Sequence, residues 1–147
     1  NQVSSATTVA KVLANTDVMN TSQAAVARIN SMITALKAET GLQDSEFIRV
    51  PFFFEAESGL GIAYDPGMVN GLSFGDGHFI APNPHGPVVG GNDILAKAFQ
   101  DAVTPHGLTI HWVEDWNLLH RNMGEVHCGS NTWRAIPTNN GFWTSGR

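Results

Sequence analysis

Apolar residues recur at helical spacing in two stretches of the chain. In the first, residues 22–39, one helical face gathers the side chains of Ala25, Ile29, Met32, Ile33 and Leu36. Polar residues at 20–22 can cap its start, and Gly41 can end it. The second stretch, residues 92–103, begins at an asparagine cap and stops before Pro105. We therefore expect two amphipathic helices.

Shorter apolar or β-branched runs without helical spacing predict strands. We expect these strands at residues 47–54, 68–74, 78–82, 108–113 and 124–128. A Gly-Asp-Gly turn at 75–77 should join the second and third of them into a hairpin, whereas 83–91 is typical of a loop and 114–122 of a helical turn. The order strand, strand, helix, strand predicts an α+β fold of mixed sheets with flanking helices, rather than a doubly wound sheet.

The composition limits the kinds of partner that the protein can have. Of the 147 residues, 42% are hydrophobic and 14% are charged, which is ordinary for a folded globular domain. The formal net charge is −5 and no cluster of Lys or Arg occurs, so we expect no nucleic-acid partner. The longest apolar runs, such as residues 50–54, are far too short to span a membrane.

The segment GEVHCGSN, residues 124–131, holds the single cysteine of the chain, Cys128. One cysteine cannot form an intrachain disulfide, which leaves a buried apolar thiol or a nucleophile as the alternatives. If residues 124–128 form a strand, His127 and Cys128 point to opposite faces, so His127 would not be the base that activates the thiol. A catalytic imidazole would then come from another part of the fold.

The same octet resembles the C-terminal active-site segment of the protein-arginine deiminases, Gly-Glu-Val-His-Cys-Gly-Thr-Asn, with Ser130 in place of the threonine. Further stretches, among them PGMVNGLSFGDGHFIAPNPHGPVVGG and WNLLHRNM, are similar to parts of the same C-terminal region in the same order. The resemblance covers Val12 to Pro137. It identifies residues 1–147 as the C-terminal part of a catalytic domain of this family.

The resemblance implies a pentein fold, a propeller of five ββαβ modules around a polar channel, of which this chain would form a part. It also implies the hydrolysis of peptidyl-arginine to peptidyl-citrulline and ammonia through a thiouronium intermediate, with Cys128 as the nucleophile. Animal members have an arginine that helps to hold the substrate backbone two residues before the octet. Asn122 stands there, and Arg121 is the nearest arginine. Asn122, Arg121 and His127 are the candidate substrate-binding residues.

The other catalytic groups of the family, a histidine and two aspartates that include a His-x-Asp motif, precede the matched region. No His-x-Asp occurs in this chain. We therefore expect a second polypeptide to supply them, as the N-terminal fragment of a secreted precursor that is cut into a heterodimer. The chain has no Asp/Glu cluster with calcium-loop spacing. We expect no cofactor or metal in this chain, and calcium, where it is used, in the partner region.

Two other functions remain open at this level. One is a guanidine hydrolase of the same superfamily that acts on free arginine or agmatine. The other is a non-catalytic binding module that keeps the pentein fold, which would account for the absence of a His-x-Asp motif.

Overall fold

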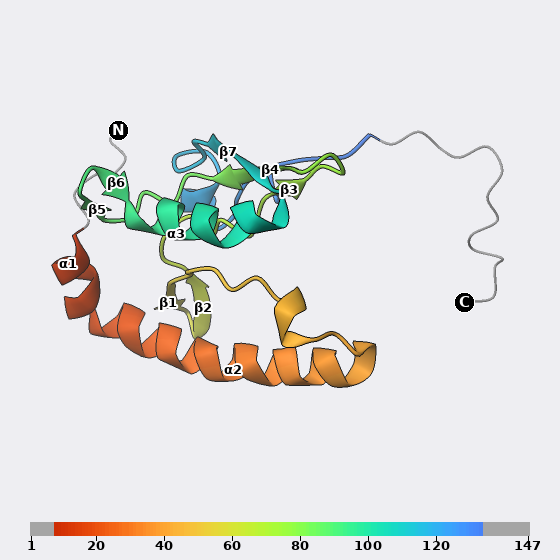
Figure 1. Ribbon diagram of the computed structural model, residues 1–147. Helices are drawn as coiled ribbons and strands as arrows, with labels where there is room; N and C mark the ends of the chain where they lie inside the picture. The colour runs from red at the N-terminus through yellow and green to blue at the C-terminus, as the bar shows by residue number, and fades with distance from the viewer. Residues whose placement is uncertain (1–7, 134–147) are drawn as a thin grey trace, which may run out of the picture.

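The computed structural model of the chain describes residues 8–133. One part is built on a long helix and the other on a small sheet, and the two lie side by side (Figure 1). The helices and strands, in chain order, are α1 (Val9–Ala14), α2 (Thr16–Thr40), β1 (Phe54–Glu57), β2 (Leu60–Ala63), β3 (Leu72–Ser73), β4 (His78–Pro82), β5 (Val88–Val89), β6 (Asn92–Asp93), α3 (Ile94–Val103) and β7 (Thr109–Val113). Short 3-10 helices lie at Asp44–Glu46, Thr104–His106 and His120–Asn122.

Helix α2 confirms the first predicted helix, but it begins earlier than the polar residues at 20–22 indicated. Its N-cap is Asn15, whose side-chain oxygen accepts a hydrogen bond from the backbone N–H of Val18 at 3.2 Å. Gly41 ends the helix in the left-handed conformation, with φ of 78°. The predicted stop was therefore right and the predicted start wrong, because residues 20–22 are polar residues inside the helix and not a cap.

The segment before the first hairpin is mostly not a strand. Of the predicted strand at 47–54, Phe54 alone belongs to β1, which pairs antiparallel with β2. Pro51 has no backbone N–H to donate to a ladder, and the segment instead lines an apolar groove beside α2. Contacts with α2 hold the hairpin: the hydroxyl of Ser22 accepts from Phe54 N at 3.0 Å, and the carboxylate of Asp17 accepts from Ala56 N at 2.9 Å.

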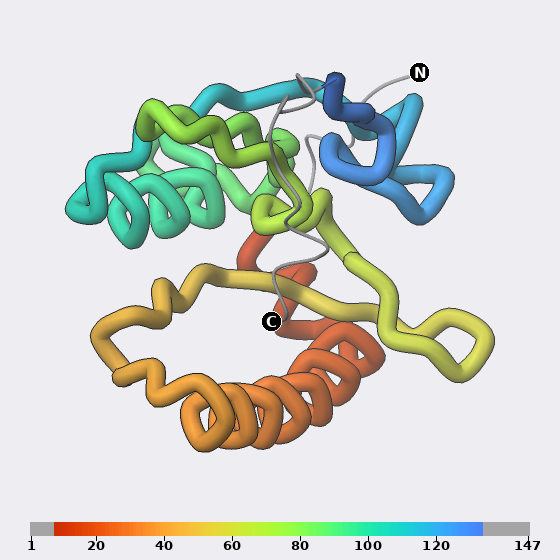
Figure 2. The backbone as a smooth tube through the Cα atoms, turned by 90° about the vertical axis from the view of Figure 1, so that its right-hand side faces the viewer, coloured from red at the N-terminus to blue at the C-terminus, as the bar shows by residue number. Residues whose placement is uncertain are grey.

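The central sheet has the order β3-β4-β7, and the predicted hairpin and the predicted strand at 108–113 both belong to it. Of the predicted strand at 68–74, residues 72 and 73 alone form β3, and residues 68–71 form a turn. Strands β3 and β4 are antiparallel, whereas β7 is parallel to β4 and follows the crossover helix α3. Figure 2 shows α3 beside this sheet, in the part of the molecule away from α2. The core between α3 and the sheet consists of Met68, Ala81, Leu95, Phe99 and Val103. β3, β4, α3 and β7 thus form one strand-strand-helix-strand unit.

The N-cap of α3 lies one residue after the predicted Asn92 cap. The cap is Asp93, whose carboxylate accepts from the backbone N–H groups of Leu95 and Ala96 at 2.9 and 3.0 Å. Asn92 and Asp93 instead form β6, which pairs with β5 inside the segment that was predicted to be a loop. That prediction was therefore wrong for residues 88 and 89.

The predicted fold class is confirmed at the level of an α+β chain with small mixed sheets. Within residues 8–133 the sheets are open and separate, and no closed or propeller-like sheet is formed. None of the helices in this range is both long and apolar enough to cross a membrane.

Candidate active site

Cys128 lies in a tight turn and not at the end of a strand. The residues from Val126 to Gly129 form the turn, which is closed by hydrogen bonds from Gly129 N to Glu125 O at 3.0 Å and from Ser130 N to His127 O at 3.1 Å. These bonds use backbone groups that a strand would offer to a neighbour, so the predicted strand at 124–128 was wrong. Strand geometry therefore does not hold His127 and Cys128 on opposite faces.

Gly129 allows the turn to form close to a neighbouring side chain. A β-carbon at this position would lie 2.7 Å from a methyl carbon of Leu119. The φ of Gly129 is not in the left-handed region, so the close approach of Leu119, and not the backbone conformation, favours glycine here.

The thiol of Cys128 is exposed and contacts one amide side chain. Asn70 Nδ2 lies 3.2 Å from Sγ, and Sγ lies 3.7 Å from Asn70 Oδ1. The amide can accept from the thiol through its oxygen and donate to the thiolate through its nitrogen. The hydrogen bond from Asn70, with a smaller backbone contribution at Glu125, holds the pKa of Cys128 below its usual value. The exposure excludes the alternative of a buried apolar thiol.

Asn70 is held in register with the cysteine turn by the backbone. The N–H of His127 donates to Asn70 O at 3.0 Å, so the two segments are joined at the residue directly before the cysteine. Asn70 lies in a turn between Pro66 and β3, where its own N–H donates to Gly67 O at 2.8 Å. The thiol and its amide partner are therefore positioned by two turns that bond to each other.

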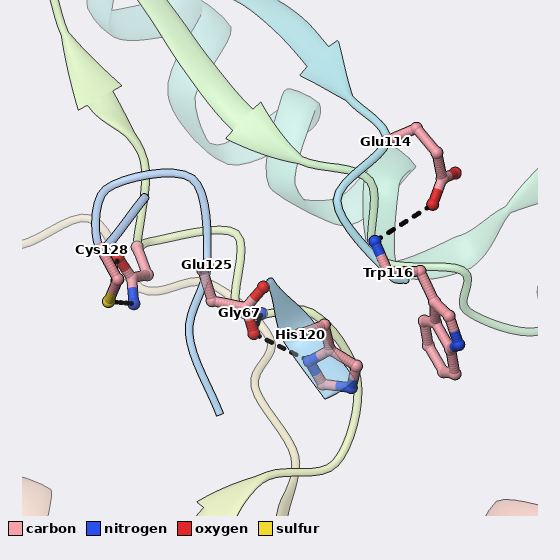
Figure 3. Close-up of polar contacts among 7 residues, drawn as sticks. Gly67, Glu114, Trp116, His120, Glu125 and Cys128 are labelled. Carbon is pink, nitrogen blue, oxygen red and sulfur yellow. Dashed lines mark hydrogen bonds and ion pairs between the residues drawn. The ribbon is translucent and has the colours of Figure 1, made fainter. Parts of the chain in front are cut away.

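Glu125 links the same two turns through its side chain. Its Oε1 accepts from Gly67 N at 3.3 Å and from His120 Nδ1 at 2.9 Å, and the residue is only 5% exposed. Figure 3 shows Glu125 between the cysteine turn and His120. A buried carboxylate is stable only when it is paired and hydrogen-bonded, so this contact fixes the entry to the cysteine turn.

Two further buried carboxylates surround this pair. Burial raises the pKa of Asp65 to about 7, and burial together with the neighbouring Glu125 raises the pKa of Asp115 to about 7. Burial works against the charged form of His120, but the hydrogen bond to Glu125 and the negative charges of Glu125, Asp115 and Asp65 outweigh it and raise the His120 pKa. We call these four residues, Asp65, Asp115, His120 and Glu125, the buried acid cluster.

Comparison with known proteins places this chain in a family. A family profile described as Protein-arginine deiminase (PAD) matches residues 1–144. The chain belongs to the protein-arginine deiminase family. Protein-arginine deiminase type-3 of Rattus norvegicus is 34% identical over 124 residues, which are 84% of this chain and 18% of that protein.

Other members of the family match a similar share of the chain. Protein-arginine deiminase type-4 of Homo sapiens is 38% identical over 100 residues, 67% of this chain and 15% of that protein. Protein-arginine deiminase type-1 of Mus musculus is 32% identical over 110 residues, 75% of this chain and 16% of that protein. The chain therefore spans less than a fifth of the length of these deiminases. The family predicted from the octet and its flanks is confirmed.

The other predicted site residues of this deiminase-family chain are spread over two places. His127 is exposed beside the cysteine, and its backbone bonds to Asn70. Asn122 is exposed and donates from Nδ2 to the backbone oxygen of Leu118 at 3.0 Å, so its amide stabilises its own turn. Arg121 lines a cavity with His120 and Asp65. Within residues 8–133, no hydrogen bond joins Arg121 or Asn122 to the thiol, and their role in binding substrate stays a prediction.

Sequence reasoning missed Asn70 and Glu125. Both were inside stretches that carried the family resemblance, PGMVN and GEVHC, but nothing in the local pattern shows that an amide 58 positions away contacts the cysteine. A glutamate next to a glycine is usually exposed, and Glu125 is buried because His120 and Gly67 pair with it. Among the described residues, no group of three or more His, Cys, Asp or Glu side chains is arranged to hold a metal ion.

Proposed function

We propose that this chain supplies the cysteine nucleophile for the hydrolysis of peptidyl-arginine to peptidyl-citrulline and ammonia. The observation that carries the proposal is the exposed thiol of Cys128 with Asn70 Nδ2 at 3.2 Å, in a chain of the deiminase family. A thiol that is exposed and has a lowered pKa is the form of cysteine that reacts as a nucleophile.

In the proposed reaction the thiolate of Cys128 attacks the central carbon of the substrate guanidinium and forms a C–S bond. The tetrahedral adduct then loses one nitrogen as ammonia, after this nitrogen takes up a proton, and an S-alkylthiouronium remains. Water adds to the same carbon and gives up its two protons, one to the group that protonated the leaving nitrogen and one to the released ammonia. The C–S bond breaks, and citrulline and the thiolate are released. Asn70 stabilises the thiolate before attack and again when it leaves, because its Nδ2 donates to a charged sulfur in both states.

The groups that protonate the leaving nitrogen and bind the guanidinium would come from outside this chain. The chain contains no His-x-Asp motif, and His120 is engaged with Glu125 in the buried acid cluster. A guanidinium is planar and permanently charged, so paired carboxylates are needed to hold it. We propose that the second polypeptide expected from the sequence, an N-terminal fragment of the same precursor, contributes these carboxylates and the histidine.

Intact mass measurement of an active sample tests the two-chain arrangement. The expected result is a species larger than the 15.8 kDa of this chain that stays with it through purification. Turnover by a sample that contains the 15.8 kDa species alone would contradict the proposal. Chelation of the active protein tests whether the partner region needs calcium, and assay of the culture medium tests the predicted secretion.

Substrate preference separates the proposal from its alternatives. The complete protein is expected to release citrulline from an N-acylated arginine amide faster than from free arginine or agmatine, and Cys128→Ala should abolish turnover. A preference for free arginine or agmatine would favour a small-molecule guanidine hydrolase. A binding module without catalytic activity would neither turn over any of these compounds nor react with a haloacetamidine faster than an ordinary exposed thiol.

A further inference from the structure

A second cavity lies apart from the thiol, between the β1–β2 hairpin and the segment after β7. It has a volume of about 410 Å³. Its walls are formed by Glu55, Glu57, Ile62, Ala63, Tyr64, Asp65, Trp116, His120, Arg121 and Met123. Figure 3 shows the rings of Trp116 and His120, and these two rings lie 4.8 Å apart at their centres. We call this space the acidic cavity.

The walls of the acidic cavity carry more negative than positive charge. Three carboxylates, from Glu55, Glu57 and Asp65, face two basic residues, Arg121 and His120. The charge of His120 is already offset by Glu125 at 2.9 Å, outside the cavity wall. Arg121 alone therefore opposes the three carboxylates.

One of these carboxylates, that of Asp65, is buried with one oxygen that accepts no hydrogen bond from the part of the chain that the structure describes. Asp65 is 7% exposed, and its Oδ2 has no hydrogen-bond partner among residues 8–133. Burial raises the pKa of Asp65 to about 7, and the nearby charge of His120 only partly offsets this rise. A buried polar atom left unpaired costs free energy, and a cation near the Asp65 carboxylate would reduce the cost of ionising it.

We propose that the acidic cavity binds a guanidinium or alkylammonium group, with Asp65 as its main acceptor. An organic cation fits better than a metal ion, because the described residues contain no cluster of three or more ligating side chains. The indole of Trp116 and the phenol of Tyr64 also line the cavity, and aromatic faces attract organic cations. The glutamates on β1 add negative charge at the other wall.

The cation can come from two sources that share this chemistry. It can be a free small molecule, or it can be the arginine or lysine side chain of another part of the polypeptide. The two differ in what they do to stability, because a permanent occupant pairs with Asp65 in the folded protein and a free ligand does not do so until it is added.

Titration of the complete protein with methylguanidinium, followed by calorimetry or amide NMR, tests the free source. Methylurea, which has similar shape and no charge, is the control ligand. The expected result is saturable binding of methylguanidinium that is weakened at least about tenfold by Asp65→Asn, since a charge-assisted hydrogen bond is lost. Asp76→Asn is the matched control, because it removes the same charge from an exposed loop between β3 and β4 and should leave binding unchanged.

Thermal unfolding of the same variants tests the second source. If a side chain of the polypeptide fills the cavity, methylguanidinium does not bind, and Asp65→Asn lowers the melting temperature while Asp76→Asn does not. If Asp65→Asn fails to fold, Glu57→Gln replaces it, because Glu57 is exposed on the hairpin and its loss should still weaken binding about threefold.

The proposal is overturned if methylguanidinium does not bind and Asp65→Asn leaves the melting temperature equal or higher. It is also overturned if methylurea binds as tightly, or if neither Asp65→Asn nor Glu57→Gln weakens binding. Binding in the acidic cavity is the part of the methylguanidinium binding that Asp65→Asn weakens and Cys128→Ala keeps, so this test is separate from the loss of turnover in Cys128→Ala.

Discussion

Asn70 precedes Cys128 by 58 positions, yet its amide nitrogen lies 3.2 Å from the sulfur. An amide carries no net charge, so it favours the thiolate by a directed hydrogen bond and does not repel a cationic substrate. In the proposed reaction the thiolate attacks a guanidinium, and a lysine or arginine beside the thiol would place a second positive charge near it. A neutral donor therefore suits this reaction better than a basic side chain.

Asn70→Ala removes this donor and the matching acceptor. We expect the pKa of Cys128 to rise towards its ordinary value, so that less thiolate is present at neutral pH. The rate of haloacetamidine labelling at pH 7 should fall by roughly threefold to tenfold, and the lower limb of its pH profile should move to higher pH. Asn117→Ala is the control, because Asn117 is exposed and belongs to a different turn. Equal labelling rates at all pH values would show that the contact does not tune the thiol.

Glu125→Gln tests the charge of the pair with His120 while it keeps an oxygen acceptor for Gly67. Without the negative charge of Glu125, the largest influence that raises the His120 pKa is lost, and burial lowers this pKa. NMR titration of the His120 imidazole should therefore give a lower pKa in the variant. Glu114→Gln is the matched control, since Glu114 pairs with His85 at 2.7 Å. A pKa of His120 that stays the same in Glu125→Gln would contradict the assigned pairing.

At the scale of the elements, the sequence predicted a helix end and a turn that depend on residues close by in the chain. Gly41 ends α2 as its position indicated, and the Gly-Asp-Gly turn joins β3 to β4. The starts of α2 and α3 were misplaced because local caps lie at Asn15 and Asp93, but the error at the cysteine turn has a distant cause. Residues 124–128 have the composition of a strand but form a turn, because Gly67 and His120 bind Glu125 and Asn70 binds the backbone of His127. None of these partners can be identified from the spacing of apolar residues, and for the same reason the amide at the thiol was missed.

Gly71→Ala should disrupt the β3–β4 hairpin. A β-carbon at Gly71 would lie 2.2 Å from the backbone oxygen of Ile80, which cannot move without breaking the sheet. We expect a loss of about 2 kcal/mol or more in the free energy of unfolding, measured by urea denaturation. Gly75→Ala is the control, because its β-carbon meets open space and its φ is not positive. The thiol should also become less reactive in Gly71→Ala, since Asn70 is the preceding residue.

At the scale of the whole molecule, the buried acid cluster joins segments that the chain separates widely. Asp65 follows the β1–β2 hairpin, and the other three members come after β7, so the cluster ties the helix-side part of the chain to the cysteine turn. The described residues contain one strand-strand-helix-strand unit, as the resemblance led us to expect of a propeller module. Closure into a propeller needs further units, which a chain spanning less than a fifth of its relatives' length does not show. The sequence could therefore predict the unit but not its assembly.

The raised pKa values of this cluster make stability depend on pH in a defined direction. The pKa of Asp115 is about 7 in the folded protein against 3.8 for an ordinary aspartate, so the folded state holds the proton more tightly. The contribution of Asp115 to the free energy of unfolding is then fully present below about pH 4, and it is lost as the pH rises through 7. The raised pKa of His120 acts in the same direction, because its pairing with Glu125 is lost when the imidazole loses its proton.

Asp115→Asn removes one of these titrations and keeps the size of the side chain. Asp115 is 2% exposed and neither carboxylate oxygen has a hydrogen-bond partner among residues 8–133, whereas an amide can donate to Glu125 without gaining a charge. We expect the variant to be more stable than the wild type by about 1 to 2 kcal/mol at pH 8 and nearly equal at pH 4, as measured by thermal and urea unfolding. Asp101→Asn, on the exposed face of α3, should leave the pH dependence unchanged. A variant that is less stable than the wild type at pH 8 would mean that the ionised Asp115 has a counter-charge in the folded protein, and the predicted sign would be wrong.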